Sequence, residues 1–345
     1  MRVARFITAS AMAGLTLLTV IPASAGTAGV RVSGIRFVAH FDFSLGQTPE
    51  NIALEPDGSA DVTFSEAAQV AQVSSDGQVR LLAQLPDPAQ ASCPISAGTP
   101  GVHAITSGIV RDSNGTLYTL LCAGTADLQG IWRLDPSGPV RVAALPASGF
   151  PNGMALDESH GFIYVTDSIL GTVWRVSLAD GSVIPWAVGP QLAPDGFFGA
   201  NGLKLHDGAV WVTNTEQGTL LRISIEPDGT AGPIQTVATG LPGIDDIAFT
   251  GSRPCAPVLA AISPSSQLVL IQPDGGEQVL LTAADGLSNP SAVAVRGDSF
   301  YVTSAAYFTR TDPNLLQGSA VHQLEESSRV ASHDLAGKIG WQAKF

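Results

Sequence analysis

The sequence predicts an all-β protein, a six-bladed β-propeller built from four-stranded antiparallel blades. A short motif recurs six times along the 345 residues, at intervals of 44 to 57 residues, and each copy is followed by β-rich segments separated by turns. Repeats of this length with four strands each are typical of propellers. A strand-like segment before the first copy also matches the strand that the last copy lacks, which indicates a closed ring.

The recurring motif is expected to begin the innermost strand of each blade. Its clearest copy reads Pro-Asn-Gly-Met-Ala-Leu over residues 151–156. The residues at the second position of the six copies are Glu50, Ser107, Asn152, Asn201, Asp245 and Ser291. Inner strands of a propeller line its central channel, so we expect these six side chains to converge there.

The third copy shows the rest of the repeat. Apolar and β-branched segments follow at residues 162–166, 172–176 and 183–188, and a turn at Asp180-Gly181 precedes the last of them. Glycine supplies the positive φ that tight hairpin turns require. Similar turns in the other copies predict the same four-stranded blade.

The sixth copy predicts how the ring closes. Its third strand is expected at residues 320–324, and no convincing fourth strand follows. Residues 35–40 have the missing pattern and would complete the sixth blade by pairing with its third strand. Such closure removes the seam that would expose unpaired backbone groups.

The first 25 residues are predicted to be a secretory signal rather than part of the fold. Arg2 and Arg5 precede an apolar run over residues 6–21, and small residues at 23–25 suit cleavage before Gly26. The run is too short for a comfortable membrane span. We therefore expect a secreted or periplasmic protein with one domain over residues 26–345 and no membrane partner after cleavage.

Charge and cysteine content narrow the function further. The chain has 17 Lys and Arg against 30 Asp and Glu, and only three lysines, so no basic face for nucleic acid is expected. An exported protein can oxidise its cysteines. Cys93 with Cys122 is the preferred bridge and Cys255 the odd one, although the sequence leaves the pairing open.

Four of the six converging residues predict a metal site. Glu50, Asn152, Asn201 and Asp245 offer only oxygen ligands if both amides turn their carbonyls inward, and their two negative charges match a divalent ion. Oxygen donors favour calcium over zinc or copper. The structural alternative is that these residues cap strand ends or turns.

The blade pattern resembles the gluconolactonase and regucalcin-like (senescence marker protein) propellers, a superfamily that includes paraoxonases and diisopropyl fluorophosphatase. The resemblance rests on Glu50, Asn152 before Gly153, Asn201 before Gly202, and Asp245, and it covers nearly all of the predicted mature chain. It implies one central calcium held by Glu50, Asn152, Asn201 and Asp245. It also implies hydrolysis of lactones or phosphoesters.

The second blade departs from that family. Its sugar-lactone members usually carry Arg-x-Asn-Asp-Gly there, whereas residues 104–108 read Ala-Ile-Thr-Ser-Gly. The arginine that would bind a sugar acid is absent, which argues against a polyol lactone as substrate. Paraoxonase-like members have His before this glycine, where the present chain has Ser107.

The candidate catalytic residues are Asp245, as metal ligand and proton acceptor together, and His103 on the long connection between residues 86 and 104. The candidate substrate-binding residues are Ser107, Phe150 and Phe198. Asp246, next to Asp245, is expected to be structural. A longer excursion between Tyr307 and Gln317 is a candidate lid.

These observations predict an exported, calcium-dependent hydrolase that acts on a small-molecule lactone, ester or related substrate. The protein is expected to be a monomer. No serine-hydrolase elbow, zinc-protease helix, phosphate-binding loop or paired-cysteine motif occurs in the sequence. The alternative is a non-catalytic propeller that binds a ligand or protein and uses any metal only as a central staple, since one fold supports many functions.

Overall fold

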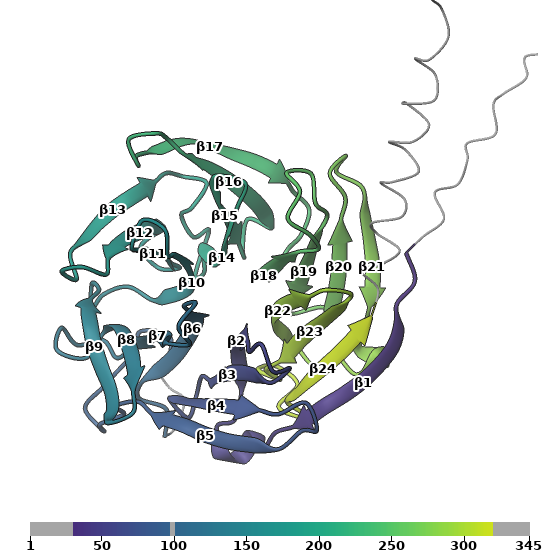
Figure 1. Ribbon diagram of the computed structural model, residues 1–345, viewed down its shortest axis with the longest axis horizontal. Helices are drawn as coiled ribbons and strands as arrows, with labels where there is room; N and C mark the ends of the chain where they lie inside the picture. The colour runs from purple at the N-terminus through teal and green to yellow at the C-terminus, as the bar shows by residue number, and fades with distance from the viewer. Residues whose placement is uncertain (1–29, 97–100, 320–345) are drawn as a thin grey trace, which may run out of the picture.

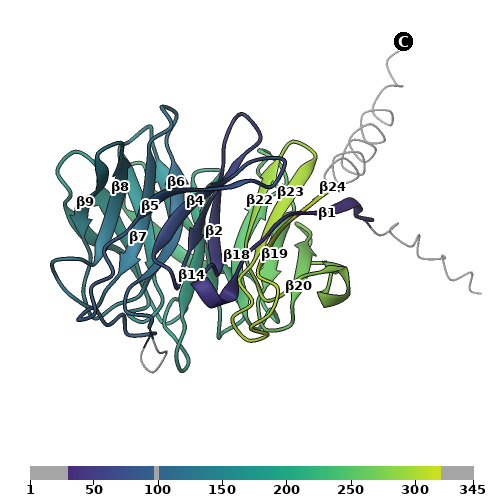
Figure 2. The ribbon, with the colours of Figure 1, turned by 90° about the horizontal axis from the view of Figure 1, so that it is seen from below.

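Six four-stranded antiparallel sheets are arranged around a common axis in the computed structural model, which describes residues 30–96 and 101–319 (Figure 1). The predicted propeller is confirmed. In each of the first five blades, the four strands lie in sequence order from the axis outwards. Figure 2 shows the ring from the side, with the strands running between its two faces. The predicted signal sequence lies outside the described residues.

The strand bounds are as follows, blade by blade. Blade one comprises β2 (Pro49–Leu54), β3 (Ala60–Phe64), β4 (Gln69–Val73) and β5 (Val79–Gln84). Blade two comprises β6 (Ile105–Arg111), β7 (Leu117–Cys122), β8 (Gly130–Asp135) and β9 (Gly138–Ala144). Blade three comprises β10 (Pro151–Asp157), β11 (Phe162–Asp167), β12 (Thr172–Ser177) and β13 (Val183–Val188). Blade four comprises β14 (Ala200–His206), β15 (Ala209–Asn214), β16 (Thr219–Ile225) and β17 (Ala231–Ala238). Blade five comprises β18 (Ile244–Phe249), β19 (Val258–Ile262), β20 (Gln267–Ile271) and β21 (Glu277–Leu281). Blade six comprises β22 (Pro290–Arg296), β23 (Ser299–Ser304), β24 (Asn314–Ser319) and β1 (Ser33–His40).

The N-terminal strand closes the ring as expected. β1 pairs antiparallel with β24 and so forms the outer strand of blade six (Figure 1). The expected position of the third strand of this blade was wrong, because β24 spans Asn314–Ser319, whereas residues 320–324 lie outside the described part of the chain. Leu315 and Leu316 are fully buried, which fixes this segment in the sheet. The short helices η1 (Phe43–Leu45) and η2 (Ala283–Asp285) lie in connections.

The hydrophobic core lies between neighbouring blades. Each contact between adjacent blades contains its own cluster of buried side chains; between blades three and four, for example, Val173 and Trp186 pack with Leu203 and Val212. Apolar burial of this kind fixes the blades relative to one another. The inner strand of each blade is therefore held in place by packing against the blade on either side. No helix among residues 30–96 and 101–319 is long and apolar enough to cross a membrane.

A buried carboxyl group lies within blade one. Asp61 on β3 has no exposed surface and neither carboxyl oxygen has a hydrogen-bond partner within the described structure. Burial, followed by the neighbouring Glu55 carboxylate, raises the pKa of Asp61 to about 8, while Gln72 and Arg111 oppose the shift. Arg111 already pairs with Glu55, its Nε lying 2.8 Å from Oε1.

Replacing Asp61 by Asn is expected to stabilise the protein at neutral pH. The folded state binds a proton at Asp61 between the ordinary pKa of 3.8 and about 8, whereas the unfolded state releases it, so stability falls as pH rises through this window. Asp61→Asn removes that loss and should raise the melting temperature at pH 8 by about 5 °C or more, with little effect at pH 4.

Thermal unfolding followed between pH 4 and pH 8 tests this. Asp57→Asn is the matched control, because Asp57 is exposed and Ser59 lowers its pKa, so the same substitution should not stabilise the protein. An Asp61→Asn protein whose melting temperature falls with pH as steeply as that of the wild type would contradict the assignment.

Candidate functional site

A β-bulge occurs near the N-terminal end of the inner strand in all six blades. In blade three, Pro151 pairs with Asp167 and Met154 with Val165, so the inner strand has one residue more than its partner. Equivalent register shifts occur in the other five blades. A bulge redirects side chains from the regular alternation of a strand, and it occurs here at the recurring sequence motif.

Glycine after the ring residue allows neighbouring blades to approach closely. A Cβ atom at Gly153 would lie 2.4 Å from the Asn201 carbonyl oxygen, and one at Gly202 would lie 2.5 Å from the Asp245 carbonyl oxygen. Both positions therefore exclude any side chain. The Asn-Gly pairs of the motif thus reflect contact between blades as well as turn formation.

Threonines in the second strands connect the bulges. Thr166 Oγ1 accepts a hydrogen bond from Gly153 N at 2.9 Å, and Thr213 Oγ1 accepts one from Gly202 N at 2.7 Å. Thr213 in turn donates to the Asp245 carbonyl oxygen of the next blade. These bonds satisfy buried backbone groups that a bulge leaves without a ladder partner and hold the axial side chains in place.

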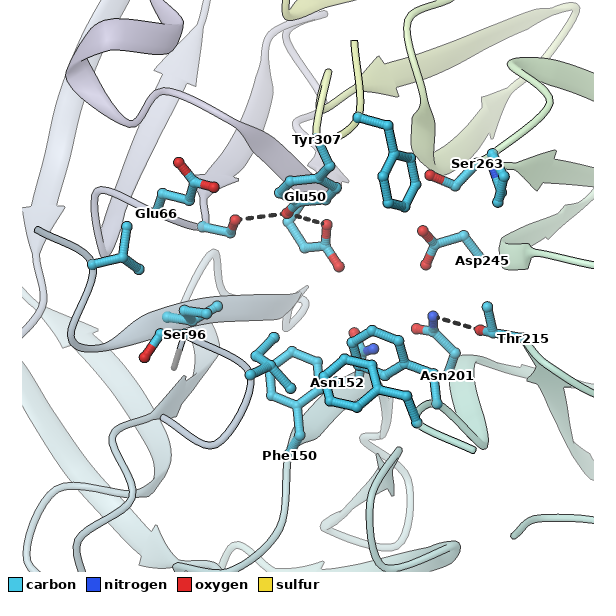
Figure 3. A pocket seen from close by; sticks show the side chains of 18 residues that line it. Glu50, Glu66, Ser96, Phe150, Asn152, Asn201, Thr215, Asp245, Ser263 and Tyr307 are labelled. Atoms are coloured by element: carbon cyan, nitrogen blue, oxygen red, sulfur yellow. Dashed lines mark hydrogen bonds between the residues drawn. The ribbon is translucent and has the colours of Figure 1, made fainter. Parts of the chain in front are cut away.

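Four of the six ring residues meet in one pocket. Glu50, Asn152, Asn201 and Asp245 come from four different blades, and Figure 3 shows their polar ends directed towards a common space. The pocket has a volume of about 230 Å³. Of the six side chains expected to converge, these four line the pocket, and Ser107 and Ser291 do not.

Both amides present their oxygens to this space. Asn152 Nδ2 donates to Ser168 Oγ at 3.1 Å. Asn201 Nδ2 donates to Thr215 Oγ1 at 2.9 Å (Figure 3). Ser168 is fixed as the acceptor, because its own proton goes to the Ala200 carbonyl oxygen at 2.7 Å. The hydrogen-bond network therefore assigns the carbonyl oxygens, which are cation ligands, to the pocket side.

Tyr307 holds the Glu50 carboxylate in position through a hydrogen bond. Its hydroxyl donates to Glu50 Oε2 at 2.6 Å, and the Ser65 hydroxyl donates to the Tyr307 oxygen, also at 2.6 Å (Figure 3). One carboxylate oxygen is thus hydrogen-bonded, while Oε1 has no such bond to Tyr307. Hydrogen bonds that orient a ligating carboxylate are typical of metal sites.

Burial is the main cause of the raised pKa of both carboxyl groups of the ring. Burial raises the pKa of Glu50 to about 7; the hydrogen bond from Tyr307 opposes the shift and the Asp246 charge adds to it. Burial, and then the charges of Glu50 and Asp246, raise the pKa of Asp245 well above its usual range. A positive charge among the four oxygens would reverse both shifts.

The four residues fit a hard divalent cation. They supply two carboxylates and two amide carbonyls, the oxygen chemistry that calcium prefers. No group of three or more His, Cys, Asp or Glu side chains that could hold a metal occurs within residues 30–96 and 101–319, so this candidate site depends on the two amide oxygens as well as on its two carboxylates. The alternative role, capping of strand ends, explains only the amide nitrogens of Asn152 and Asn201, which bond Ser168 and Thr215. It does not explain why the two amide oxygens are directed into the pocket.

Asp246 has the structural role expected for it. Lys204 Nζ on β14 lies 2.6 Å from the Asp246 carboxylate on β18, and Asp246 is almost fully buried. The pair links blades four and five just behind the ring. Burial raises the pKa of Asp246, and the Lys204 charge opposes that shift.

Ser107, a predicted substrate-binding residue, lies outside the pocket. Its side chain has no exposed surface, and its hydroxyl donates to the Pro151 carbonyl oxygen of the next blade at 2.7 Å. Ser291 does the same for Pro49, also at 2.7 Å. The two serines join neighbouring inner strands, and neither is retained as a substrate contact.

His103, a predicted catalytic residue, is not among the side chains that line the pocket. Its Nδ1 faces Asp87 Oδ1 at 3.5 Å, and the geometry does not make a hydrogen bond. The long connection does reach the pocket, but through Ile95, Ser96 and Val102. We therefore do not retain His103 as proton acceptor.

Phe150 and Phe198 line the pocket as expected, and Phe197 joins them. The Phe150 and Phe198 rings lie 5.7 Å apart between centroids, and Phe197 packs edge-on against Phe198 at 4.5 Å. Asp167 Oδ1 accepts a hydrogen bond from the Phe150 backbone N–H at 3.0 Å, which holds the first ring in place. The three rings form an apolar part of the pocket lining.

The long connection is pinned to blade two by a disulfide. Cys93 and Cys122 are bonded, as preferred from the sequence, and Cys255 is free and exposed. Cys93 N also donates to the His103 carbonyl oxygen at 2.9 Å, closing the connection on itself. Both bonded cysteines are fully buried behind Phe150 and Ile105. The disulfide therefore supports one wall of the pocket.

The proposed excursion in blade six is shorter than predicted, because residues 314–317 belong to β24. The remaining connection places Tyr307 and Phe308 in the pocket lining. Asn289 Oδ1 accepts hydrogen bonds from Phe308 N at 2.9 Å and Thr309 N at 3.0 Å, so this segment is anchored to its own blade. This segment therefore contributes Phe308 to the pocket lining and Tyr307 as the hydrogen-bond donor to Glu50.

Sequence reasoning missed Tyr307 and a third pocket carboxyl group, Glu66. Burial raises the pKa of Glu66, and the Arg310 charge opposes the shift. The sequence does contain a signal for the residues that support the pocket side chains. A residue with a hydroxyl group directly follows the second strand in four blades. These residues are Ser65, Ser168, Thr215 and Ser263. Ser65, Ser168 and Thr215 bond Tyr307, Asn152 and Asn201 respectively. Ser65, Thr215 and Ser263 line the pocket.

The fold and the pocket together define the class of protein: a six-bladed β-propeller with oxygen donors on its axis. No protein-family model matches the sequence, and no curated protein matches it either. Solved structures of similar fold include six-bladed propellers of the gluconolactonase and regucalcin type.

Three solved structures illustrate this likeness. Regucalcin from Agrobacterium tumefaciens, a calcium-binding protein, is 13% identical, covers 84% of this chain and 94% of its own, and gives a TM-score of 0.60. The gluconolactonase XC5397 from Xanthomonas campestris is 14% identical over 84% and 91%, with a TM-score of 0.58. An aldose sugar dehydrogenase from Streptomyces coelicolor, solved with PQQ bound, is 17% identical over 85% and 98%, with a TM-score of 0.61. At these identities the likeness concerns the fold.

Proposed function

We propose that this protein is an exported, calcium-dependent hydrolase of a small lactone, ester or related compound. One observation carries the proposal: four oxygen donors from four blades converge on the axis, with both amides turned carbonyl-inward by Ser168 and Thr215. The gluconolactonase and the calcium-binding regucalcin of similar fold support it. Export rests on the N-terminal sequence alone.

The chain's own residues divide the work of hydrolysis. A bound calcium ion would be held by Glu50, Asn152, Asn201 and Asp245, and it would polarise the substrate carbonyl and stabilise negative charge on its oxygen. Asp245 accepts a proton from the attacking water, whose oxygen bonds to the carbonyl carbon. The carbon–oxygen bond of the ester or lactone breaks, and Asp245 returns the proton to the departing oxygen, which regenerates the carboxylate.

The direct test compares hydrolysis of a panel of lactones and esters by calcium-loaded and chelator-treated protein. Turnover that requires calcium supports the proposal. A calcium-loaded protein that hydrolyses none of the panel would favour the non-catalytic alternative, in which the ion only joins four blades.

Replacing Tyr307 by Phe is expected to weaken calcium binding about tenfold, because the hydroxyl that orients Glu50 is lost. Calorimetric titration with calcium measures the change. Tyr301→Phe is the matched control: Tyr301 is a buried tyrosine of the same blade that does not line the pocket, and its loss should leave calcium affinity unchanged. Equal affinities for the two variants would show that Tyr307 does not position Glu50.

A further inference from the structure

Two charged residues depart from the recurring motif, and they meet between blades four and five. The fifth position of the motif is Ala or Val in five copies, whereas the fourth copy has Lys204. The third position is uncharged in five copies, whereas the fifth copy has Asp246. Lys204 Nζ lies 2.6 Å from each carboxylate oxygen of Asp246. The other four copies form inner strands without either charge, so the propeller fold does not require the pair.

The pair lies directly beside two of the four ring residues. Asp246 follows Asp245 in the chain, and its carboxylate packs against Gly202, which follows Asn201. A Cβ atom at Gly202 would lie 2.6 Å from Asp246 Oδ1. The Asp246 side chain is 2% exposed and the Lys204 side chain 29% exposed. Water and salt therefore screen the charge of Asp246 only weakly from the ring.

The ring and the pair form one electrostatic system. Glu50 and Asp245 carry the two negative charges that match a divalent ion, and Lys204 neutralises a third, that of Asp246. Burial is the main cause of the raised pKa of Glu50 and of Asp245, and the Asp246 charge adds to both shifts. No Lys, Arg or His occurs among the described residues that line the pocket. Lys204 thus supplies a positive charge that the pocket lining lacks.

We propose that Lys204 sets the calcium affinity of the ring by neutralising Asp246. With the pair intact, a divalent ion meets two negative charges. Without Lys204 it would meet a third, and without Asp246 it would meet an uncompensated ammonium group. Charges at short range in a weakly screened site change binding strongly. The inference rests on the calcium site of the proposed function and adds a residue that tunes this site from outside the pocket.

Calorimetric titration of calcium into chelator-treated Lys204→Met and Asp246→Asn proteins tests the inference. The titrations are made at about pH 8.5, to favour the ionised form of carboxyl groups. Lys204→Met should bind calcium at least about fivefold more tightly than the wild type, and Asp246→Asn at least about fivefold more weakly. The double variant lacks both charges and should return to within about threefold of the wild type.

The opposite signs distinguish this role from a purely structural one. A pair that only joined two blades would lose its function in either single variant, and both variants would then bind calcium more weakly. Comparing the double variant with either single variant gives the same charge effect, so the test holds even where one single variant does not fold. Weaker binding in both single variants, or unchanged affinity in both, would overturn the inference.

Arg111→Met is the matched control. Arg111 and Glu55 form a partly buried ion pair between blades one and two, with Nε 2.8 Å from Oε1. Neither residue lines the pocket. This substitution changes the net charge of the protein by the same amount as Lys204→Met, yet it should leave calcium affinity within about twofold of the wild type. Equal tightening by the two substitutions would overturn the inference, because it would trace the effect to net charge.

Hydrolysis measured in parallel separates this inference from the proposed function. Opposite effects on calcium affinity, in a protein that hydrolyses no lactone or ester, would overturn the hydrolase and leave the inference intact. Calcium-dependent hydrolysis without the opposite effects would overturn the inference and leave the hydrolase intact. A wild-type protein that binds no calcium would overturn both.

Discussion

Asp245→Asn should abolish the calcium response and lower hydrolysis by about 10²–10⁴-fold, because it removes a cation ligand and the proposed proton acceptor together. The substitution keeps the shape of the side chain. In calcium-free protein at neutral pH it should also raise the melting temperature, since burial and the charges of Glu50 and Asp246 make an ionised Asp245 unfavourable. Loss of function accompanied by a gain in stability is the expected signature.

Asp246→Asn provides the contrast at the neighbouring position. Asp246 pairs with Lys204 at 2.6 Å, and breaking a buried ion pair from one side leaves the other charge without compensation. The same substitution one residue along the chain should therefore lower the melting temperature. Kinetics and thermal unfolding of both variants are the measurements. An Asp245→Asn protein that retains wild-type hydrolysis would remove Asp245 from the mechanism.

Joint replacement of Cys93 and Cys122 by Ala should lower stability by about 3–4 kcal/mol, as expected for a bridge between residues 29 apart. The melting temperature should fall by roughly 10 °C. Because the bridge anchors the connection that carries Ile95 and Val102 into the pocket, substrate binding should weaken as well.

Thermal unfolding of this double variant, and of the wild type with and without a reducing agent, tests the role of the bridge. Cys255→Ala is the control, because Cys255 is exposed and unbridged and should have no effect. Two outcomes would contradict the account: an unchanged melting temperature in the double variant, or a substrate KM that does not rise when the bridge is removed.

The architecture was predictable because a propeller repeats one solution six times. Each inner strand needs the same bulge and each blade the same contacts, so Asn152, Asn201 and Asp245 recur at similar intervals. Closure by β1 was readable because the last blade lacked a fourth strand and residues 35–40 carry the matching pattern. The repeated threonines Thr166 and Thr213 were an unused signal of the same kind.

Features outside the repeat were not predictable. The third strand of blade six was misplaced because Asn314–Ser319 ends in polar and small residues, and only burial of Leu315 and Leu316 against the neighbouring strands identifies it. Tyr307 and Glu66 lie in connections whose paths no periodicity determines. His103 was favoured for its chemistry and nearness in sequence, yet the connection presents Val102 to the pocket instead.

Calorimetric titration of calcium into chelator-treated wild-type protein tests the central claim most directly. The account predicts one calcium ion bound per chain, with a melting temperature that rises with calcium concentration because the ion binds the folded state. No heat of binding and no thermal stabilisation at millimolar calcium would contradict the metal site and, with it, the proposed mechanism.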